Sequence, residues 1–469
     1  MTYKLDLDTD LLVIGGGPGG YVAAIYAARK GLDVTLVESS RLGGACLNVG
    51  CIPTKALVKS SELCKDLRSA GNFGMIIDGN IEVDMAAIID RKDETKDRLG
   101  SGIEFLMKKN KINLLYGHGS FIDENKVIVK GEEDLVVTFK NVIIATGSKI
   151  SNIRIPGIDL SCVMNSTDAL KCKELPQSIT IVGGGVIGME FAFIYRNLGV
   201  EVHVIEYMDR LLAMADRDIS RELLKICRKA GIKVSTKAKV TSIEQLDDGQ
   251  ALVNYEGRKG MESTKSDKVL LATGREPNLD NLGLENIDLR LNDNDRGIAV
   301  DETMVSNLKH VYAIGDVTDI YQLAHVASYQ AMVAVDNIIG KERKADYRAV
   351  PNVIFTSPEI ASVGLSEEEC KERKIDYSVS KSSYINNGKA LTMGQNEGFV
   401  KLIKENATGE IIGCSIIGPD ASALISTITL GISNGIKDDN LRQMIFVHPT
   451  TSEVIQEAAQ NLDFGAIHQ

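Results

Sequence analysis

Apolar positions and glycines follow the same order in two stretches of the chain. Residues 10–38, DLLVIGGGPGGYVAAIYAARKGLDVTLVE, begin with a short apolar run, pass through Gly-x-Gly-x-x-Gly into an apolar helical pattern, and end in a second apolar run. Residues 178–206, SITIVGGGVIGMEFAFIYRNLGVEVHVIE, repeat this order. A β-branched run followed by a helical pattern and a second run is typical of strand, helix and strand. The chain is therefore predicted to contain two βαβ units.

Three further short apolar runs each contain a glycine near their end. They are residues 141–148 (NVIIATGS), 268–278 (KVLLATGREPN) and 310–317 (HVYAIGDV). Continuous apolar runs of this kind are typical of strands buried in a parallel sheet, and the glycine leaves room for a ligand or a crossing chain. We expect these strand ends to face bound nucleotides.

The order of these patterns predicts an α/β protein with two Rossmann-like dinucleotide-binding domains and a C-terminal α+β domain. From residue 346 on, strands and helices alternate without the glycine fingerprint. A length of 469 residues leaves room for roughly three domains. The predicted segments are 1–148 for the first part of the first dinucleotide-binding domain, 149–274 for the second, inserted domain, 275–345 for the continuation of the first, and 346–469 for the α+β domain.

The composition is that of a globular protein, with 44% hydrophobic and 25% charged residues. A net charge of −11 argues against nucleic acid or an anionic membrane as a partner. The first ten residues lack the basic start and apolar run of an export signal, and glycines with Pro18 break the uncharged residues 11–28 into strand, turn and helix. Eight cysteines are too few for a secreted disulfide framework. We therefore expect a cytoplasmic protein, in which a close cysteine pair is catalytic rather than structural.

In each βαβ unit, the three glycines and the final glutamate have separate roles in dinucleotide binding. The first glycine permits the tight turn, the second lets a pyrophosphate approach the backbone, and the third lets helix and strand pack closely. The helix N-terminus directs N–H groups at the phosphates, and the terminal carboxylate accepts hydrogen bonds from the adenosine ribose. Ordinary βαβ packing without a ligand is the alternative interpretation. The residues are Gly15, Gly17, Gly20 and Glu38 in the first unit and Gly183, Gly185, Gly188 and Glu206 in the second.

The segment GGACLNVGCIPTKAL, residues 43–57, holds two cysteines, Cys46 and Cys51. Five residues of regular helix separate Cα atoms by about 7.5 Å along the axis, beyond the roughly 7 Å limit for a disulfide. A bond between them needs an irregular turn, for which Gly50 supplies backbone freedom, and Pro53 then restarts a helix. A disulfide in such a tight ring at a helix N-terminus is easily reduced and reoxidised. The segment therefore predicts a redox-active pair.

Two other interpretations of the cysteine pair are less favoured. A zinc site needs two more ligands at comparable spacing, and the remaining cysteines show no second pair of that kind. Two buried structural thiols would not need the glycines at residues 43–44 and 50, which indicate a ligand lying against this segment. No metal site is predicted.

Over essentially its whole length, the chain resembles the pyridine nucleotide–disulfide oxidoreductases of the flavoprotein type. Residues 43–57 resemble the active-disulfide signature, with Thr-Lys after the proline as in lipoamide-dependent members, and HVYAIGDV resembles the segment whose aspartate, here Asp316, binds the flavin ribityl chain. Residues 358–369, PEIASVGLSEEE, and 448–459, HPTTSEVIQEAA, resemble the interface domain and its catalytic end. One departure is Phe446, where many lipoamide-dependent members carry an additional histidine.

The resemblance implies a homodimer with FAD in the first nucleotide site and NAD in the second. Cys46 is then the interchange thiol attacked by a dithiol substrate, and Cys51 lies against the flavin and passes electrons to it. His448 deprotonates the incoming thiol, and Glu453 holds the imidazole in the productive tautomer. In the family this histidine–glutamate pair comes from the other subunit.

Further residues are expected at the cofactors. Lys55 and Glu190 would form an ion pair near the flavin. The remaining predicted cofactor-binding positions are Gly44, Gly119, Gly147, Ser148, Gly274 and Ala324. Histidines other than His448 are expected to be structural or incidental, namely His118, His203, His310, His325 and His468.

The expected activity is NAD-dependent oxidation of dihydrolipoamide carried by a separate lipoyl-bearing protein of a multienzyme complex. Glu206 would bind both ribose hydroxyls of NAD and repel the 2′-phosphate of NADP, with Arg210 as a competing phosphate ligand. Two alternatives remain: an NAD(P)H-dependent disulfide reductase of the glutathione type, and a flavin-binding complex subunit without catalysis. A metal-ion reductase is disfavoured because NLDFGAIHQ, residues 461–469, has no cysteine pair.

Overall fold

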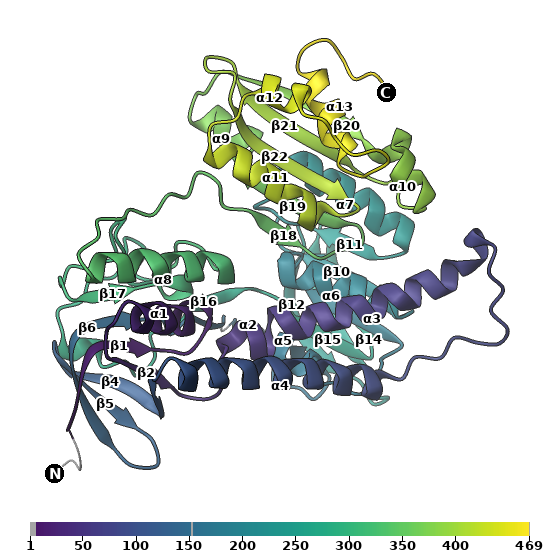
Figure 1. Ribbon diagram of the computed structural model, residues 1–469. Helices are drawn as coiled ribbons and strands as arrows, with labels where there is room; N and C mark the ends of the chain where they lie inside the picture. Colours follow the sequence, from purple (N-terminus) through teal and green to yellow (C-terminus); the bar gives the residue numbers. More distant parts are fainter. Residues whose placement is uncertain (1–5, 152, 469) are drawn as a thin grey trace. The chain divides into compact units, whose positions relative to one another are not determined.

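The computed structural model describes residues 6–151 and 153–468. The chain clusters into two compact units, each assembled from segments far apart in the sequence (Figure 1). The segments are Met1–Leu57, Ala86–Asn152 and Gly274–Asp346 in the first unit, and Val58–Met85, Ile153–Thr273 and Tyr347–Gln469 in the second.

A seven-stranded sheet forms the centre of the first unit. Its strand order is β3-β2-β1-β6-β5-β4, and β17 pairs with β6. The pairs β1–β2, β2–β3, β1–β6 and β6–β17 are parallel, whereas β4, β5 and β6 pair antiparallel. The strands are β1 (Asp6–Ile14), β2 (Val34–Glu38), β3 (Asn113–Tyr116), β4 (His118–Asp123), β5 (Lys126–Lys130), β6 (Leu135–Ile144) and β17 (Val311–Ala313), and a separate antiparallel pair is β7 (Ser148–Ile150) with β16 (Arg275–Pro277).

The two faces of this sheet are buried in different clusters. Leu11 and Val13 of β1 lie in one apolar cluster, and Leu12 and Ile14 lie in the other, as the period of two in a strand requires. The first cluster includes α1 and α8, which Figure 1 shows lying together over the sheet. The helical elements are α1 (Pro18–Arg29), α2 (Gly44–Val49), the start of α3 (Cys51–Ser69), α4 (Met85–Lys109), η2 (Leu284–Asn286), η3 (Gly315–Thr318) and α8 (Ala324–Ile338).

A five-stranded parallel sheet, in the order β11-β10-β9-β15-β8, forms the first half of the second unit. An antiparallel sheet, β12-β13-β14, accompanies it. The strands are β8 (Val163–Asn165), β9 (Ser178–Val182), β10 (Glu201–Glu206), β11 (Lys233–Thr236), β12 (Lys239–Gln245), β13 (Ala251–Gly257), β14 (Gly260–Ser266) and β15 (Lys268–Leu271). The helices are η1 (Ala70–Phe73), which follows α3, and α5 (Ser166–Ala169), α6 (Val186–Asn197) and α7 (Arg217–Ala230).

The rest of the second unit is an antiparallel sheet with helices packed on it. The strand order is β18-β19-β22-β21-β20, and apolar residues of α11 and α13 share one core cluster with the inner strands. The strands are β18 (Asn352–Ile354), β19 (Glu359–Gly364), β20 (Tyr377–Ser383), β21 (Phe399–Glu405) and β22 (Ile411–Gly418). The helices are α9 (Glu367–Glu372), η4 (Tyr384–Asn386), α10 (Gly388–Thr392), α11 (Ala421–Ser433), α12 (Asp438–Gln443) and α13 (Glu453–Asn461).

The predicted fold class is confirmed. The two repeated patterns form β1–α1–β2 and β9–α6–β10. The three glycine-bearing runs contain the end of β6, all of β15 and all of β17, each of which pairs in parallel with at least one neighbour. The boundaries of the four predicted segments stay predictions. Among the described residues, no helix is long and apolar enough to cross a membrane.

Candidate active site

The first βαβ unit leaves a cradle at the N-terminus of α1 that only glycine permits. Gly15 has φ +105°, and a Cβ at Gly20 would lie 1.8 Å from the Gly15 carbonyl oxygen. A Cβ at Gly17 would instead meet only the Gly44 Cα, at 3.8 Å. The close helix–strand packing predicted for the third glycine is therefore present, and the second glycine borders open space at the helix N-terminus, where a pyrophosphate fits.

Glu38 ends β2 and is held by two backbone amides. Its Oε2 accepts the Gly16 N–H at 2.7 Å, and its Oε1 accepts the Ser40 N–H at 2.8 Å. The side chain is buried beside the cradle. Because a carboxylate has about four acceptor positions, these bonds orient Glu38 and leave capacity for ribose hydroxyls.

A chain of hydrogen bonds runs from Arg275 through Ser148 to Asp316. The Arg275 Nε donates to the Ser148 Oγ at 2.8 Å, and that hydroxyl donates to the Asp316 Oδ2 at 2.6 Å. Burial raises the pKa of Asp316, and Ser148 and Arg275 oppose this by favouring the carboxylate. Arg275 was not predicted from the sequence, although it lies in the apolar run 268–278. Its bonding partner is more than a hundred residues away, and no local pattern shows such a contact.

The first unit also holds the other predicted cofactor positions. Gly119 lies in β4, and an added Cβ there would lie 3.4 Å from Ile14, the last residue of β1, and 3.5 Å from Val37 of β2. Gly147 has φ +69°, with nothing within 4 Å of an added Cβ. Ala324 is the first residue of α8. Gly274 also has a positive φ, of +110°.

The two cysteines lie on either side of a break between helices. α2 ends at Val49, Gly50 has φ −142° and ψ −113°, and α3 begins at Cys51. This backbone conformation lies outside the main regions open to residues with a Cβ, and an added Cβ would lie 2.9 Å from the Ala45 carbonyl oxygen. The predicted irregular turn at Gly50 is confirmed. The helix predicted to restart around Pro53 is also present: α3 begins at Cys51, and Pro53 lies in its first turn, where no amide hydrogen is needed.

The two thiols have different ionisation preferences. A side-chain hydrogen bond with Cys51, burial and the charge of Cys51 raise the pKa of Cys46 above its usual range, while the ammonium of Lys55 acts in the opposite direction. Cys51 is exposed and occupies the first position of α3, where the helix dipole favours a thiolate. The raised pKa therefore favours the protonated form of Cys46, and the two thiols of the pair are not equivalent.

The second βαβ unit repeats the cradle of the first. Gly183 has φ +110°, an added Cβ at Gly188 would lie 1.9 Å from the Gly183 carbonyl oxygen, and an added Cβ at Gly185 meets nothing within 4 Å. Glu206 ends β10 as Glu38 ends β2, and its carboxylate accepts the Gly184 N–H. The two βαβ units are therefore alike in hydrogen bonding as well as in sequence.

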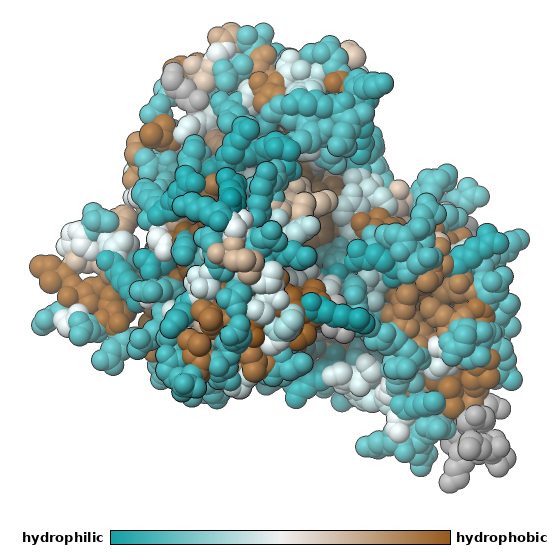
Figure 2. All heavy atoms as spheres, turned by 180° about the vertical axis from the view of Figure 1, so that it is seen from behind, coloured by the Kyte–Doolittle hydropathy of each residue, from teal (hydrophilic) through white to brown (hydrophobic). Residues whose placement is uncertain are grey.

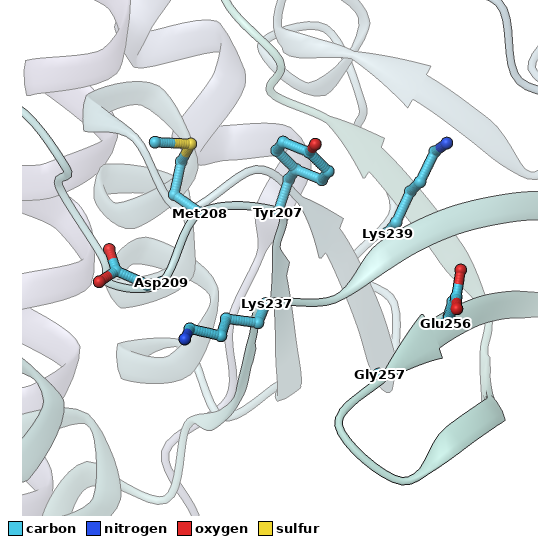
Figure 3. Close-up of a pocket in the computed structure, with 7 residues that line it drawn as sticks. All are labelled: Tyr207, Met208, Asp209, Lys237, Lys239, Glu256 and Gly257. Atoms are coloured by element: carbon cyan, nitrogen blue, oxygen red, sulfur yellow. The ribbon is translucent and has the colours of Figure 1, made fainter.

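A cleft of about 600 Å³ opens directly after Glu206 (Figure 3). The side chains of Lys237 and Asp209 lie on the same side of it in this view. The cleft is lined by Tyr207, Met208, Asp209, Lys237, Lys239, Glu256 and Gly257.

Arg210, the competing phosphate ligand, is held within its own loop. Its Nη2 donates to the Ala213 carbonyl oxygen at 2.7 Å. The Met208 amide, two residues earlier, donates to the second oxygen of Glu206. The carboxylate, and not the guanidinium, is thus the group positioned beside the cradle.

His448 and Glu453 form a hydrogen-bonded pair in the second unit. The His448 Nδ1 lies 2.8 Å from the Glu453 Oε1, and the Glu453 Oε2 accepts the Thr450 N–H at 2.9 Å. Partial burial would raise the pKa of Glu453, but the Thr450 amide and the imidazole outweigh it and lower the pKa. Since a carboxylate fixes Nδ1, Nε2 is the nitrogen that can exchange a proton, which is the arrangement of an oriented base.

Two predicted relationships join residues of different units. Cys46 and Cys51 belong to the first unit and His448 to the second, and the same holds for Lys55 and Glu190. These pairings stay predictions. Glu190 itself is buried in α6, where it accepts the Phe355 N–H at 3.0 Å.

Comparisons with known proteins cover nearly the whole chain. Residues 9–331 match the family described as pyridine nucleotide-disulphide oxidoreductase, and residues 350–459 match its dimerisation domain. A dihydrolipoyl dehydrogenase of Chlamydia muridarum is 42% identical over 96% of both chains, and one of Bacillus subtilis is 38% identical over 98% of both. Among solved structures, the HOCl-induced flavoprotein disulfide reductase RclA from Escherichia coli aligns with a TM-score of 0.86 and 29% identity, over 96% of this chain and 99% of that one. With its two dinucleotide cradles, its cysteine pair and these matches, the chain belongs to the pyridine nucleotide–disulphide oxidoreductase family.

Proposed function

We propose that the chain oxidises protein-bound dihydrolipoamide to lipoamide with NAD⁺. The observation that carries this proposal is the cysteine pair Cys46 and Cys51, set across a helix break, in a chain that also holds the oriented His448–Glu453 base. Relatives of about 40% identity over nearly the full length are dihydrolipoyl dehydrogenases, which supports the substrate class.

Residues at the two cradles would hold the two nucleotides. The open space at Gly17 and the carboxylate of Glu38 fit the pyrophosphate and ribose of FAD, and Asp316, which accepts the Ser148 hydroxyl, would hold the ribityl chain. Gly185 and Glu206 would do the same for NAD. When bound, FAD would supply the two-electron acceptor through which electrons pass from the dithiol to NAD⁺.

The different ionisation preferences of Cys46 and Cys51 suggest an order for the exchange with the substrate dithiol. His448 takes the proton of the incoming thiol, because a thiolate is the attacking species. Attack on the Cys46 sulfur breaks its bond to Cys51, which leaves as the thiolate that the start of α3 favours. When Cys46 is later released, its raised pKa favours taking up a proton.

A homodimer is part of the proposal. Residues 350–459 match a dimerisation domain, and two apolar side chains next to the base, Ile445 and Val447, are 94% and 72% exposed in the single chain. Apolar groups also lie exposed on the segment that joins α3 to α4 (Figure 2), where Ile76 is 97% exposed. Contact between subunits would cover such groups and bring the His448 of one chain to the Cys46 of the other.

The lipoyl group would come from a separate protein of a multienzyme complex, in the cytoplasm. The exposed position of His448 leaves it open to a lipoyl group on another chain. The sparse cysteines suit a reducing compartment, in which thiols outside the active pair stay reduced.

Parallel steady-state assays of the holoenzyme test the proposal. We expect turnover with dihydrolipoamide and NAD⁺, and at most a trace of activity with oxidised glutathione and NADPH. The reverse preference would favour the glutathione-type reductase. If protein that holds FAD turned over neither dihydrolipoamide with NAD⁺ nor oxidised glutathione with NADPH, a flavin-binding subunit without catalysis would be favoured.

A further inference from the structure

A second histidine–glutamate pair lies on the helix that carries Glu453. The His468 Nδ1 is 2.7 Å from the Glu457 Oε1, against 2.8 Å in the pair formed by His448 and Glu453. The two histidine side chains are similarly exposed, at 76% and 79%. The sequence pattern does not show this pair, because eleven residues separate its members.

The two pairs lie side by side. Glu453 and Glu457 are one helical turn apart on α13, so their side chains are neighbours on one face. In both pairs the carboxylate holds Nδ1, so that Nε2 is the atom able to exchange a proton. The proximity also acts electrostatically, since both His448 and His468 lower the pKa of Glu453.

The second histidine is anchored by the elements that anchor the first. The Glu457 Oε2 accepts the N–H groups of Ile467 and His468, at 2.8 and 3.2 Å. The Asn386 side chain donates to the His468 carbonyl oxygen at 3.1 Å. The neighbouring Asn387 donates in the same way to the loop of His448, at the Thr450 carbonyl oxygen. Two neighbouring asparagines, Asn386 and Asn387, therefore hold both the segment of His468 and the loop of His448.

The charges around the two imidazoles are mostly acidic. Glu453 and Glu457 contact them directly, and Asp463 on the His468 segment pairs with Arg442 of α12. In each pair the carboxylate orients the imidazole through Nδ1, which leaves Nε2 to take a proton from a substrate thiol.

The proposed reaction releases two thiol protons, and one imidazole can hold only one at a time. After the first exchange step His448 carries the proton of the first thiol, so it cannot also accept the proton of the second. We propose that His468 is the second base of the dithiol exchange. This inference rests on the proposed oxidation of dihydrolipoamide.

The steps balance with two bases. The first substrate thiol gives its proton to His448 and attacks the Cys46 sulfur, and the bond between Cys46 and Cys51 breaks with Cys51 leaving as a thiolate. The second substrate thiol gives its proton to His468 and attacks the substrate sulfur of the mixed disulfide. The Cys46 thiolate then leaves and takes the proton from His448. The substrate has lost two electrons and two protons, which remain as the electron pair of the reduced cysteines and as protons on Cys46 and His468.

Rapid mixing of the oxidised holoenzyme with dihydrolipoamide without oxygen, followed by acid quench, thiol blocking and intact mass measurement, tests this assignment. We expect His468→Gln to form the adduct of Cys46 with the substrate at a rate within about twofold of the wild type. The same variant should resolve the adduct roughly 10²-fold more slowly, at the lower end of the effect of a general base. The adduct should therefore accumulate, and added free imidazole should restore its resolution.

Two further variants keep the test decisive. Glu457→Gln keeps an oxygen for the Ile467 amide but removes the carboxylate, and it should slow the same step by a smaller factor. His118→Gln, a histidine whose Nε2 contacts the Asn281 carbonyl oxygen, should change nothing. Unchanged adduct lifetime in His468→Gln would overturn the second-base assignment. Absence of any adduct or turnover in the wild type would instead overturn the proposed function.

Discussion

At the scale of single residues, the proposed dithiol chemistry depends on which group holds a proton or a charge. Cys46 and Cys51 carry the same chemistry but sit in different places, one partly buried and one exposed at the start of a helix. Burial and a neighbouring thiol raise the pKa of Cys46, and the helix dipole favours the thiolate of Cys51. These positions support the proposed roles of Cys46 as interchange thiol and Cys51 as the thiol that passes electrons to the flavin.

The choice of nicotinamide also belongs to a single side chain. Glu206 faces the cradle with both oxygens oriented by backbone amides, and a 2′-phosphate beside it would meet an unscreened carboxylate. We expect a preference for NAD of at least about 100-fold in kcat/KM, roughly 2.7 kcal/mol. Glu206→Ala should shrink this ratio chiefly by improving the use of NADP. The exposed Glu201→Ala at the other end of β10 is the matched control and should leave the ratio unchanged. Equal use of NADH and NADPH by the wild type would contradict the assignment.

At the scale of elements, the break between α2 and α3 brings the two cysteines within reach of each other. The sequence indicates this break because Gly50 stands next to the second thiol. It does not indicate where α3 starts, because Pro53 is compatible with the first turn as well as with the first position of a helix. Contacts between distant segments are also hidden from the sequence, as Arg275 and Ser148 illustrate. The repeated βαβ units could be predicted fully because each of their signals is local.

Replacement of Gly50 tests the break directly. Gly50→Ala places a Cβ 2.9 Å from the Ala45 carbonyl oxygen and disfavours the observed backbone conformation, so the sulfur atoms should move apart. Turnover should fall by at least about tenfold, given that a misplacement of 1 Å can cost roughly 10²-fold. FAD content should be unchanged. Gly100→Ala in α4, where an added Cβ meets nothing within 4 Å, is the control. Full activity of Gly50→Ala would show that the break does not position the thiols.

A buried ion cluster joins three elements of the second unit. The side chain of Lys401, in β21, is 2% exposed. It contacts Asp216 and Asp218 at the start of α7 and Glu367 of α9. Burial alone would lower the pKa of Lys401, but its hydrogen bonds to these carboxylates raise it, and the pKa values of Asp218 and Glu367 are lowered. The stabilisation by this cluster should therefore be lost in acid, beginning below about pH 4, where carboxyl groups of the unfolded chain take up protons. It should also be lost in strong alkali, where Lys401 loses its proton.

Lys401→Met leaves the buried Asp216 and the partly buried Asp218 and Glu367 without their cation. We expect a loss of about 3–5 kcal/mol in the free energy of unfolding, seen as a fall in Tm of at least about 5 °C by calorimetry. Lys381→Met, which removes a 44% exposed lysine from the same Asp218, should cost at most about 1 kcal/mol. Equal effects of the two variants would show that burial does not strengthen the cluster.

At the scale of the whole molecule, the catalytic groups are divided between two units of the chain. The cysteine pair lies with the first dinucleotide cradle, and the His448–Glu453 base lies with the part that matches a dimerisation domain. Such a division suits a site completed by a second copy of the chain. Sequence motifs identify both halves, but no sequence pattern shows which copies supply them.

A mixed dimer distinguishes the two possibilities. We expect dimers with His448→Gln on one chain and Cys46→Ser on the other to recover one working site, although each variant alone should be inactive or slowed by roughly 10²–10⁴-fold. Recovery of about half the wild-type activity per dimer, in tagged and purified mixed dimers, is the expected result. No recovery would place both groups in the same chain.

If a substrate dithiol reduces the Cys46–Cys51 disulfide, anaerobic titration with dihydrolipoamide should change the flavin spectrum of the holoenzyme. The wild-type holoenzyme should develop the long-wavelength absorption of a Cys51 thiolate lying against the flavin, at about one equivalent of dithiol per chain. Cys46→Ser should show that absorption before any dihydrolipoamide is added, and further additions should not change it. A wild-type spectrum that does not respond to dihydrolipoamide, or a Cys46→Ser variant that still turns over, would contradict the account.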